Sequence, residues 1–127
     1  MVLDSSAIVA IHLREPGHER LIDRIDTAEV VVGRPHSGRN RDGVNGPVGH
    51  DARPMLFAHL RRLDTEVVAF NAEHLDAAVT AFIRFRRAHH PAALNFGESM
   101  SWAVASVAGM PLLFTGEDFG RTDIAPA

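Results

Sequence analysis

Short apolar blocks alternate with helix-like spacings in the first part of the chain. Residues 1–4 start with three apolar side chains and predict a short buried strand, and Ser5 favours a helix start directly after it. We expect a second helix after Pro16, because proline suits the first helical position; its apolar stripe would be Leu21, Ile22 and Ile25. Residues 30–32 are consecutive valines, which predict a strand buried on both faces.

The same alternation returns after the middle of the chain. Leucines spaced for one helical face predict a helix within residues 54–63, and residues 66–70 predict a strand. The next helix shows the spacing i, i+3, i+4, i+7 of an amphipathic helix. The side chains that we expect to face the core are Leu75, Ala78, Val79 and Phe82.

The last part of the chain predicts one more helix and one more strand. The helix opens at Glu98 and ends at Gly109, with Met100, Val104 and Val107 directed inward. Residues 112–114 form a short apolar block, and an acidic loop follows it. Short apolar strands that alternate with helices predict an α/β protein, specifically a three-layer α/β/α domain with a short parallel sheet, formed by residues 1–127 as a single unit.

Residues 33–50 interrupt this pattern with the sequence GRPHSGRNRDGVNGPVGH. Five of the chain's ten glycines lie here, and neither a helical nor a strand period is visible. Such composition is typical of loops or disordered segments, and a structureless connection of this length is uncommon inside a compact domain. We therefore predict an irregular, insert-like segment within the single domain.

Composition removes several classes of chemistry. All 13 lysine-plus-arginine residues are arginine, and the chain has neither cysteine nor tyrosine. The absence of lysine excludes a P-loop and Schiff-base catalysis, and the absence of cysteine excludes thiol nucleophiles and disulfides. Carboxylates, histidines and hydroxyls remain as catalytic candidates.

Composition also bears on location. An acidic residue stands early in the N-terminal segment, where a signal peptide would be positively charged, and no apolar run approaches the roughly 18 residues of a membrane span. The absence of cysteine fits a reducing compartment. We expect a cytoplasmic protein that does not contact a membrane.

Acidic residues follow the first and last predicted strands. Asp4 ends the first strand, Glu117 and Asp118 follow the last, and Glu98 stands at a helix start. Sites in open parallel sheets form outside the carboxyl ends of the strands, so these acids could converge. Converging carboxylates repel one another unless a hard divalent cation, which prefers oxygen ligands, lies between them. The spacing thus indicates a metal site suited to phosphodiester cleavage.

Each acid also has a purely structural interpretation. Asp4 could cap the helix that follows it, and Glu98 could interact with the dipole of its own helix. Glu117 and Asp118 could form a solvated turn. Spacing alone leaves these interpretations open beside the metal site.

Three strings strengthen the metal-site hypothesis: Asp4-Ser5-Ser6-Ala7, HPAALNFGES at 90–99 and PLLFTGEDFGRTDIAPA at 111–127. They closely resemble the VapC toxins of mycobacterial type, which are PIN-domain nucleases, and the resemblance covers about residues 1–32 and 51–127. It implies an α/β/α fold and a toxin–antitoxin endoribonuclease that cleaves RNA with water activated by Mg²⁺ or Mn²⁺. It also implies a cognate VapB-like antitoxin and, as in many members, a homodimer.

The resemblance places the acids of the family on this sequence. Its first acid falls on Asp4, and its helix-start acid falls on Glu98, where aspartate is usual. Its late acid falls within the Glu117-Asp118 pair, and the sequence does not decide between them. We therefore expect Asp4, Glu98 and Asp118 as catalytic metal ligands, with Glu117 in reserve.

One part of the family pattern is missing. The family has a glutamate on a helix soon after the second strand, but residues 33–50 contain no glutamate and only one other acid, Asp42. An alternative to the nuclease is therefore a catalytically impaired PIN-like module that only binds antitoxin or RNA. A phosphoryl-aspartate protein built on Asp4 is disfavoured, because such proteins generally use a lysine to neutralise the phosphoryl group.

A local basic run lies between the last two predicted helices: Arg84, Arg86, Arg87, His89 and His90. It has two equal interpretations, a solvated loop or a contact with phosphate, for which arginine is well suited. Adjacent histidines usually point apart and no further zinc ligand accompanies them, so we do not expect a zinc site. We expect Trp102 to belong to the core.

Overall fold

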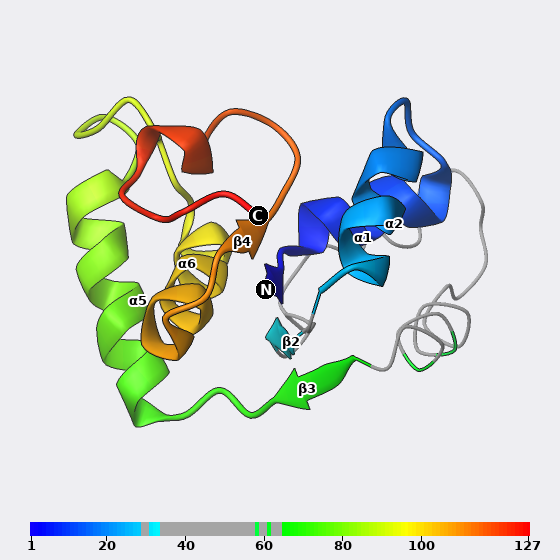
Figure 1. Cartoon of the computed structure of the whole chain (residues 1–127). Coiled ribbons are helices and arrows are strands. Elements are labelled where there is room, and N and C mark those ends of the chain that lie inside the picture. Colours follow the sequence, from blue (N-terminus) through cyan, green and yellow to red (C-terminus); the bar gives the residue numbers. More distant parts are fainter. Residues whose placement is uncertain (29–30, 34–57, 59–60, 62–64) are drawn as a thin grey trace, which may run out of the picture.

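A computed structural model describes residues 1–28, 31–33, 58, 61 and 65–127. Helices lie on both sides of a small central sheet (Figure 1). In chain order the elements are β1 (Val2–Leu3), α1 (Ser5–Leu13), α2 (His18–Asp26), β2 (Val31–Gly33), β3 (Glu66–Val68), α5 (Ala72–Phe85), α6 (Phe96–Ala108), β4 (Leu112–Leu113) and the 3₁₀ turn Phe119–Arg121.

The sheet has the strand order β3-β2-β1-β4, and all pairs are parallel. In the register of β1 and β4, Val2 lies beside Leu112 and Leu3 beside Leu113. Successive side chains of a strand point to opposite faces. Val2 and Leu112 accordingly pack with α5 and α6 in one core, whereas Leu3 and Leu113 pack with α1 and α2 in the other.

These two cores confirm the predicted three-layer α/β/α architecture. The larger core buries Phe85 of α5 and Trp102 of α6, as expected for Trp102, and the smaller core buries Ile11 and Ile25. Each fully buried large apolar side chain contributes about 1.5–3 kcal/mol to folding. Because both faces of β1 and β4 are buried, the ends of these strands are fixed firmly enough to position a site.

The start of α2 differs from the prediction. Pro16 was expected at the first helical position, but α2 begins at His18 and Gly17 is its N-cap. Gly17 adopts a φ of 91°, a left-handed conformation that glycine reaches without steric cost. The turn between α1 and α2 needs this conformation immediately before the helix, so Pro16 lies outside the helix.

The prediction of the inward face of α5 was partly wrong. Ala78 is buried as expected, but Leu75 is 50% exposed and Val79 42% exposed. The buried side chains of this helix are His74, Ala78, Ala81 and Phe85. Alanines allow α5 to approach α6 closely, and the neighbouring stripe of larger residues, at the same helical spacing, therefore faces solvent.

Most other boundaries agree with the sequence to within one or two residues. Val104 of α6 is buried, while Met100 and Val107 are only partly buried. The predicted irregular segment began at Gly33, but the structure places Gly33 at the end of β2. The rest of that segment and nearly all of the predicted helix at 54–63 lie outside the described residues. Within the described part of the chain, no helix is long and apolar enough to span a bilayer.

Candidate metal and phosphate site

A pocket of about 490 Å³ opens between the C-terminal end of α5, the N-terminal end of α6 and the loop after β4. Its polar lining consists of Arg86, Arg87, Asn95, Glu98 and Asp118, and the rings of Phe82 and Phe96 also line it. The pocket thus brings together two basic and two acidic side chains that lie up to 32 positions apart in sequence (86 to 118).

Asp4 stands directly after β1 and is buried, with 3% of its surface exposed. Its backbone N–H donates to the Leu113 carbonyl at 2.9 Å, which fixes it against the end of β4. Its Oδ2 accepts a hydrogen bond from the Ser6 N–H at 2.8 Å, so Asp4 does cap α1. Because this cap uses one oxygen, a role for the other oxygen remains compatible with it.

Glu98 occupies the third position of α6 and forms a reciprocal capping box with Asn95. Its N–H donates to Asn95 Oδ1 at 2.9 Å, and its Oε2 accepts from the Asn95 N–H at 2.6 Å. Burial raises the pKa of Glu98, the Asn95 N–H opposes this rise, Asp118 and Asp4 raise the pKa further, and Arg87 lowers it. The field of both other acids therefore reaches the Glu98 carboxylate.

The structure separates the two neighbouring acids of the last loop. Glu117 points into solvent, with 83% of its side chain exposed, and its Oε2 pairs with Arg121 Nη2 at 2.9 Å. Asp118 precedes the 3₁₀ turn, makes no capping hydrogen bond there and lines the pocket with Glu98. The sequence left this pair undecided, and only Asp118 shares the pocket.

Asp4, Glu98 and Asp118 are neighbours, but their carboxylates are not gathered around one point. In the described ranges (1–28, 31–33, 58, 61 and 65–127), no three histidine, aspartate or glutamate side chains are close enough together to hold a metal ion. Asp42, the substitute considered for the missing family acid, lies outside the described residues.

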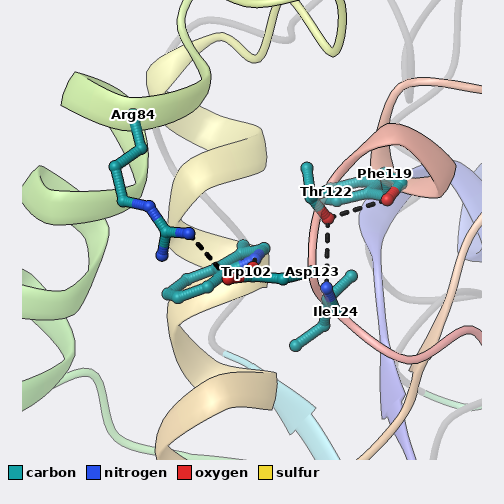
Figure 2. A network of polar contacts seen from close by, with 6 residues as sticks. All are labelled: Arg84, Trp102, Phe119, Thr122, Asp123 and Ile124. Carbon is teal, nitrogen blue, oxygen red and sulfur yellow. Dashed lines mark hydrogen bonds and ion pairs between the residues drawn. The ribbon is translucent and has the colours of Figure 1, made fainter.

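Hydrogen bonds connect the C-terminal segment that follows Asp118 to both α5 and α6 (Figure 2). Asp123 Oδ2 accepts from Arg84 Nη2 at 2.8 Å, and its Oδ1 accepts from Trp102 Nε1 at 3.2 Å. The Thr122 hydroxyl donates to the Phe119 carbonyl at 2.7 Å within the same turn. Sequence reasoning gave Asp123 no role, although it lies within the string 111–127.

The basic run divides into two parts. Arg84 has a structural role, since it pairs with Asp123 and its guanidinium lies 4.6 Å from the centre of the Phe85 ring. The ring of His90 packs edge-on against Phe85, and its Nδ1 accepts from the Ala92 N–H at 3.2 Å. Of the five residues in the basic run, only Arg86 and Arg87 line the pocket.

The family model of the PIN domain matches residues 1–125, so the chain belongs to this family. The match agrees with the parallel α/β/α fold and with the acids that follow its strands. Ribonuclease VapC of Mycolicibacterium smegmatis is 36% identical over 126 residues, 98% of both chains. Ribonuclease VapC30 of Mycobacterium tuberculosis is 33% identical over 126 residues, 98% of this chain and 96% of that one. Ribonuclease VapC42 of Mycobacterium tuberculosis is 35% identical over 132 residues, 100% of this chain and 98% of that one. The resemblance inferred from the three strings is confirmed.

Proposed function

We propose that this protein is a divalent-metal-dependent endoribonuclease and the toxin of a toxin–antitoxin pair. Its relatives over nearly the full length are named VapC ribonucleases. The observation that supports the activity most directly is the electrostatic coupling of Glu98 to both Asp4 and Asp118. Glu98 and Asp118 line one pocket, and the charge of Asp4 acts on Glu98 from outside that lining.

The residues present fit a hard divalent cation. Asp4, Glu98 and Asp118 would supply carboxylate oxygens, the ligands that Mg²⁺ and Mn²⁺ prefer. Glu117 would be a reserve ligand, available only if its pair with Arg121 breaks. A bound ion would supply Lewis acidity and lower the pKa of a water molecule at the scissile phosphate.

Backbone hydrogen bonds hold two of the three proposed ligands, Asp4 and Glu98. The Ser6 N–H holds one oxygen of Asp4, and the Asn95 N–H holds one oxygen of Glu98. The Thr115 N–H donates to the Ser6 hydroxyl at 3.1 Å and thereby links the start of α1 to the loop that leads to Asp118. These bonds would limit the rotation of the carboxylates and so reduce the entropic cost of arranging them around an ion.

Cleavage of a labelled RNA by the Asp4→Asn protein tests the proposed site. Asparagine is an equally good N-cap, so the fold should be kept while an anionic ligand is lost. We expect wild-type cleavage with Mn²⁺ or Mg²⁺, none in chelator, and at least a hundredfold slower cleavage by Asp4→Asn, as for loss of one strong electrostatic contact in a transition state. Asp23→Asn, an exposed aspartate in α2, is the matched control. Cleavage that persists in chelator would refute the metal mechanism.

Separate substitutions of Glu117 and Asp118 test which of the two acids binds the ion. Asp118 lines the pocket and Glu117 pairs with Arg121, so Asp118→Asn should lose most of the activity and Glu117→Gln little. The reverse order would show that the loop rearranges when the ion binds. The same RNA cleavage assay measures both variants.

The impaired-module alternative makes a different prediction for the same assay. It rests on the missing glutamate in residues 33–50 and on the separation of the three carboxylates. If wild type cleaves no RNA with either ion yet still binds a partner, the chain is a binding module. No other outcome favours this alternative.

We also propose a small VapB-like antitoxin as partner, RNA as substrate and a homodimer as the free form. A pocket that holds Glu98 and Asp118 could receive a basic side chain from the antitoxin. Co-expression with the adjacent reading frame should give a stable complex, and light scattering should give twice the chain mass for the free toxin. Failure of every small neighbouring protein to co-purify would contradict the toxin–antitoxin assignment.

A further inference from the structure

We infer that Arg86 and Arg87 form a phosphate-binding subsite, which holds the RNA backbone beside the acids. This inference rests on the proposed ribonuclease function and extends it to the recognition of the substrate. Both arginines line the same pocket as Glu98 and Asp118, so a phosphodiester bound by them lies next to the acidic site.

Hydrogen bonds hold the backbone of Arg86 in place, whereas its guanidinium group is not fully hydrogen-bonded. It ends α5, where its N–H donates to the Phe82 carbonyl at 3.0 Å, and its own carbonyl accepts from the N–H groups of His89 and His90, both at 3.1 Å. Its Nε is buried and has no hydrogen-bond partner in the part of the chain that the structure describes. A buried donor of a charged group strongly favours an acceptor, and two adjacent guanidinium N–H groups match the oxygens of a phosphate.

Arg87 adds a second charge at the same opening. It is exposed, and its charge offsets a small part of the rise in the pKa of the Glu98 carboxyl. Neither Arg86 nor Arg87 forms an ion pair with a described residue. A bound anion could therefore engage both without first breaking an ion pair to one of these residues.

Two other arginines near the pocket show what a structural role looks like in this molecule. Arg84 pairs with Asp123, and Arg121 pairs with Glu117 and donates to the Pro91 carbonyl at 3.1 Å. Their donors are used within the fold, whereas the Nε of Arg86 is not. The basic run thus combines one structural arginine with two whose side chains line the pocket.

The pocket favours a nucleic-acid backbone over an isolated anion. Its acids would repel a free anion unless a cation is bound, whereas an RNA strand can present one phosphate to the cation and another to the arginines. The rings of Phe82 and Phe96 line the same pocket and offer apolar contact to a ribose or base. Single-stranded RNA is therefore the ligand that matches all sides of the pocket.

The salt dependence of RNA binding tests the subsite without relying on cleavage. A labelled single-stranded RNA is titrated with the Asp4→Asn protein in Mn²⁺, and the affinity is measured by fluorescence anisotropy at several salt concentrations. Each lost phosphate contact should reduce the slope of log K against log salt by about 0.7. We expect this reduction, with about tenfold weaker binding, for Arg86→Gln and for Arg87→Gln added to that background.

Control variants separate a phosphate contact from loss of charge or of fold. Arg20→Gln removes an exposed arginine in α2, on the other side of the sheet, and should leave the slope unchanged. Arg86→Lys keeps the charge but loses the planar pair of donors, so it should keep the slope and still weaken binding. In the active protein, Arg87→Gln should raise KM about tenfold with little change in kcat, as expected for a contact made equally in the bound and transition states.

The outcomes distinguish this inference from the proposed function. Arginine-dependent binding by a protein that never cleaves RNA would support the subsite and overturn the ribonuclease. Normal cleavage with a slope that neither arginine affects would overturn the subsite alone, as would undetectable binding by the Asp4→Asn parent. Variants that weaken capture of a co-expressed antitoxin but not binding of RNA would show a protein contact and would also overturn the inference.

Discussion

Glu98 both supports α6 through its capping box and stands in an environment that opposes its charge. Burial, Asp118 and Asp4 raise its pKa against the opposing effects of the Asn95 N–H and Arg87. An acid with a raised pKa binds its proton more tightly in the folded than in the unfolded state. Its contribution to stability is present at low pH and is lost as the pH rises from its usual value of 4.5 through the raised value.

Glu98→Gln should therefore raise the Tm of the metal-free protein at neutral pH. Glutamine preserves the capping box but removes the charge. The difference from wild type should shrink as the pH falls toward 4.5, measured by thermal unfolding in chelator. Glu73→Gln, an exposed glutamate in the first turn of α5, is the control and should not stabilise the protein. A neutral-pH Tm below that of wild type would contradict this account.

At the scale of elements, Asp123 connects α5 and α6 to the C-terminal segment (Figure 2). The ion pair with Arg84 is half exposed and is worth at most about 1 kcal/mol. Trp102, by contrast, is only 7% exposed, so its Nε1–H would lose its acceptor in a buried place. A buried donor without an acceptor costs about 1–3 kcal/mol.

Asp123→Ala should therefore reduce the free energy of unfolding by about 1–3 kcal/mol. Asp123→Asn retains an oxygen for Trp102 and should lose only about 0–1 kcal/mol. Urea unfolding followed by tryptophan fluorescence measures both, since Trp102 is the one tryptophan. Equal losses for the two variants would mean that the ion pair, and not the tryptophan bond, dominates.

At the scale of the whole molecule, a divalent ion that bridges Asp4, Glu98 and Asp118 would join segments from both ends of the chain. Binding to the folded state alone stabilises it by about 2.7 kcal/mol at a free concentration of 100 times Kd. Mn²⁺ should raise the Tm more than Mg²⁺ at equal concentration, because it binds a given ligand set more tightly and tolerates a site with fewer acids.

Thermal unfolding across a series of ion concentrations measures this effect directly. Asp4→Asn removes one of three anionic ligands, so its shift should be smaller at each ion concentration, whereas Asp23→Asn should keep the wild-type shift. Identical shifts for wild type and Asp4→Asn would place the ion elsewhere in the protein. Because no RNA is needed, the result is independent of the cleavage assay.

Much of the fold follows from local patterns in the sequence. The apolar block at 1–3 forms β1, and Asp4 lies at its end because a buried strand that is two residues long delivers the next polar side chain to the sheet edge. Asn95 and Glu98 specify the start of α6, and Gly109 specifies its end with a left-handed φ of 63°. These features depend on backbone geometry and hydrogen bonds within a few residues, which a short stretch of sequence determines.

Where the sequence offered equivalent candidates, the tertiary structure decided which of them is buried, paired or part of the pocket. Two stripes of α5 have the same helical spacing, and close packing of its alanines against α6 buried one and left Leu75 exposed. Glu117 and Asp118 differ in environment because Arg121 holds the first and the pocket includes the second. Arg84 and Arg86 differ because Asp123, 39 residues beyond Arg84, reaches only one of them. Apart from the local Glu117–Arg121 pair, these choices depend on contacts between segments distant in the chain, whose geometry no local period encodes.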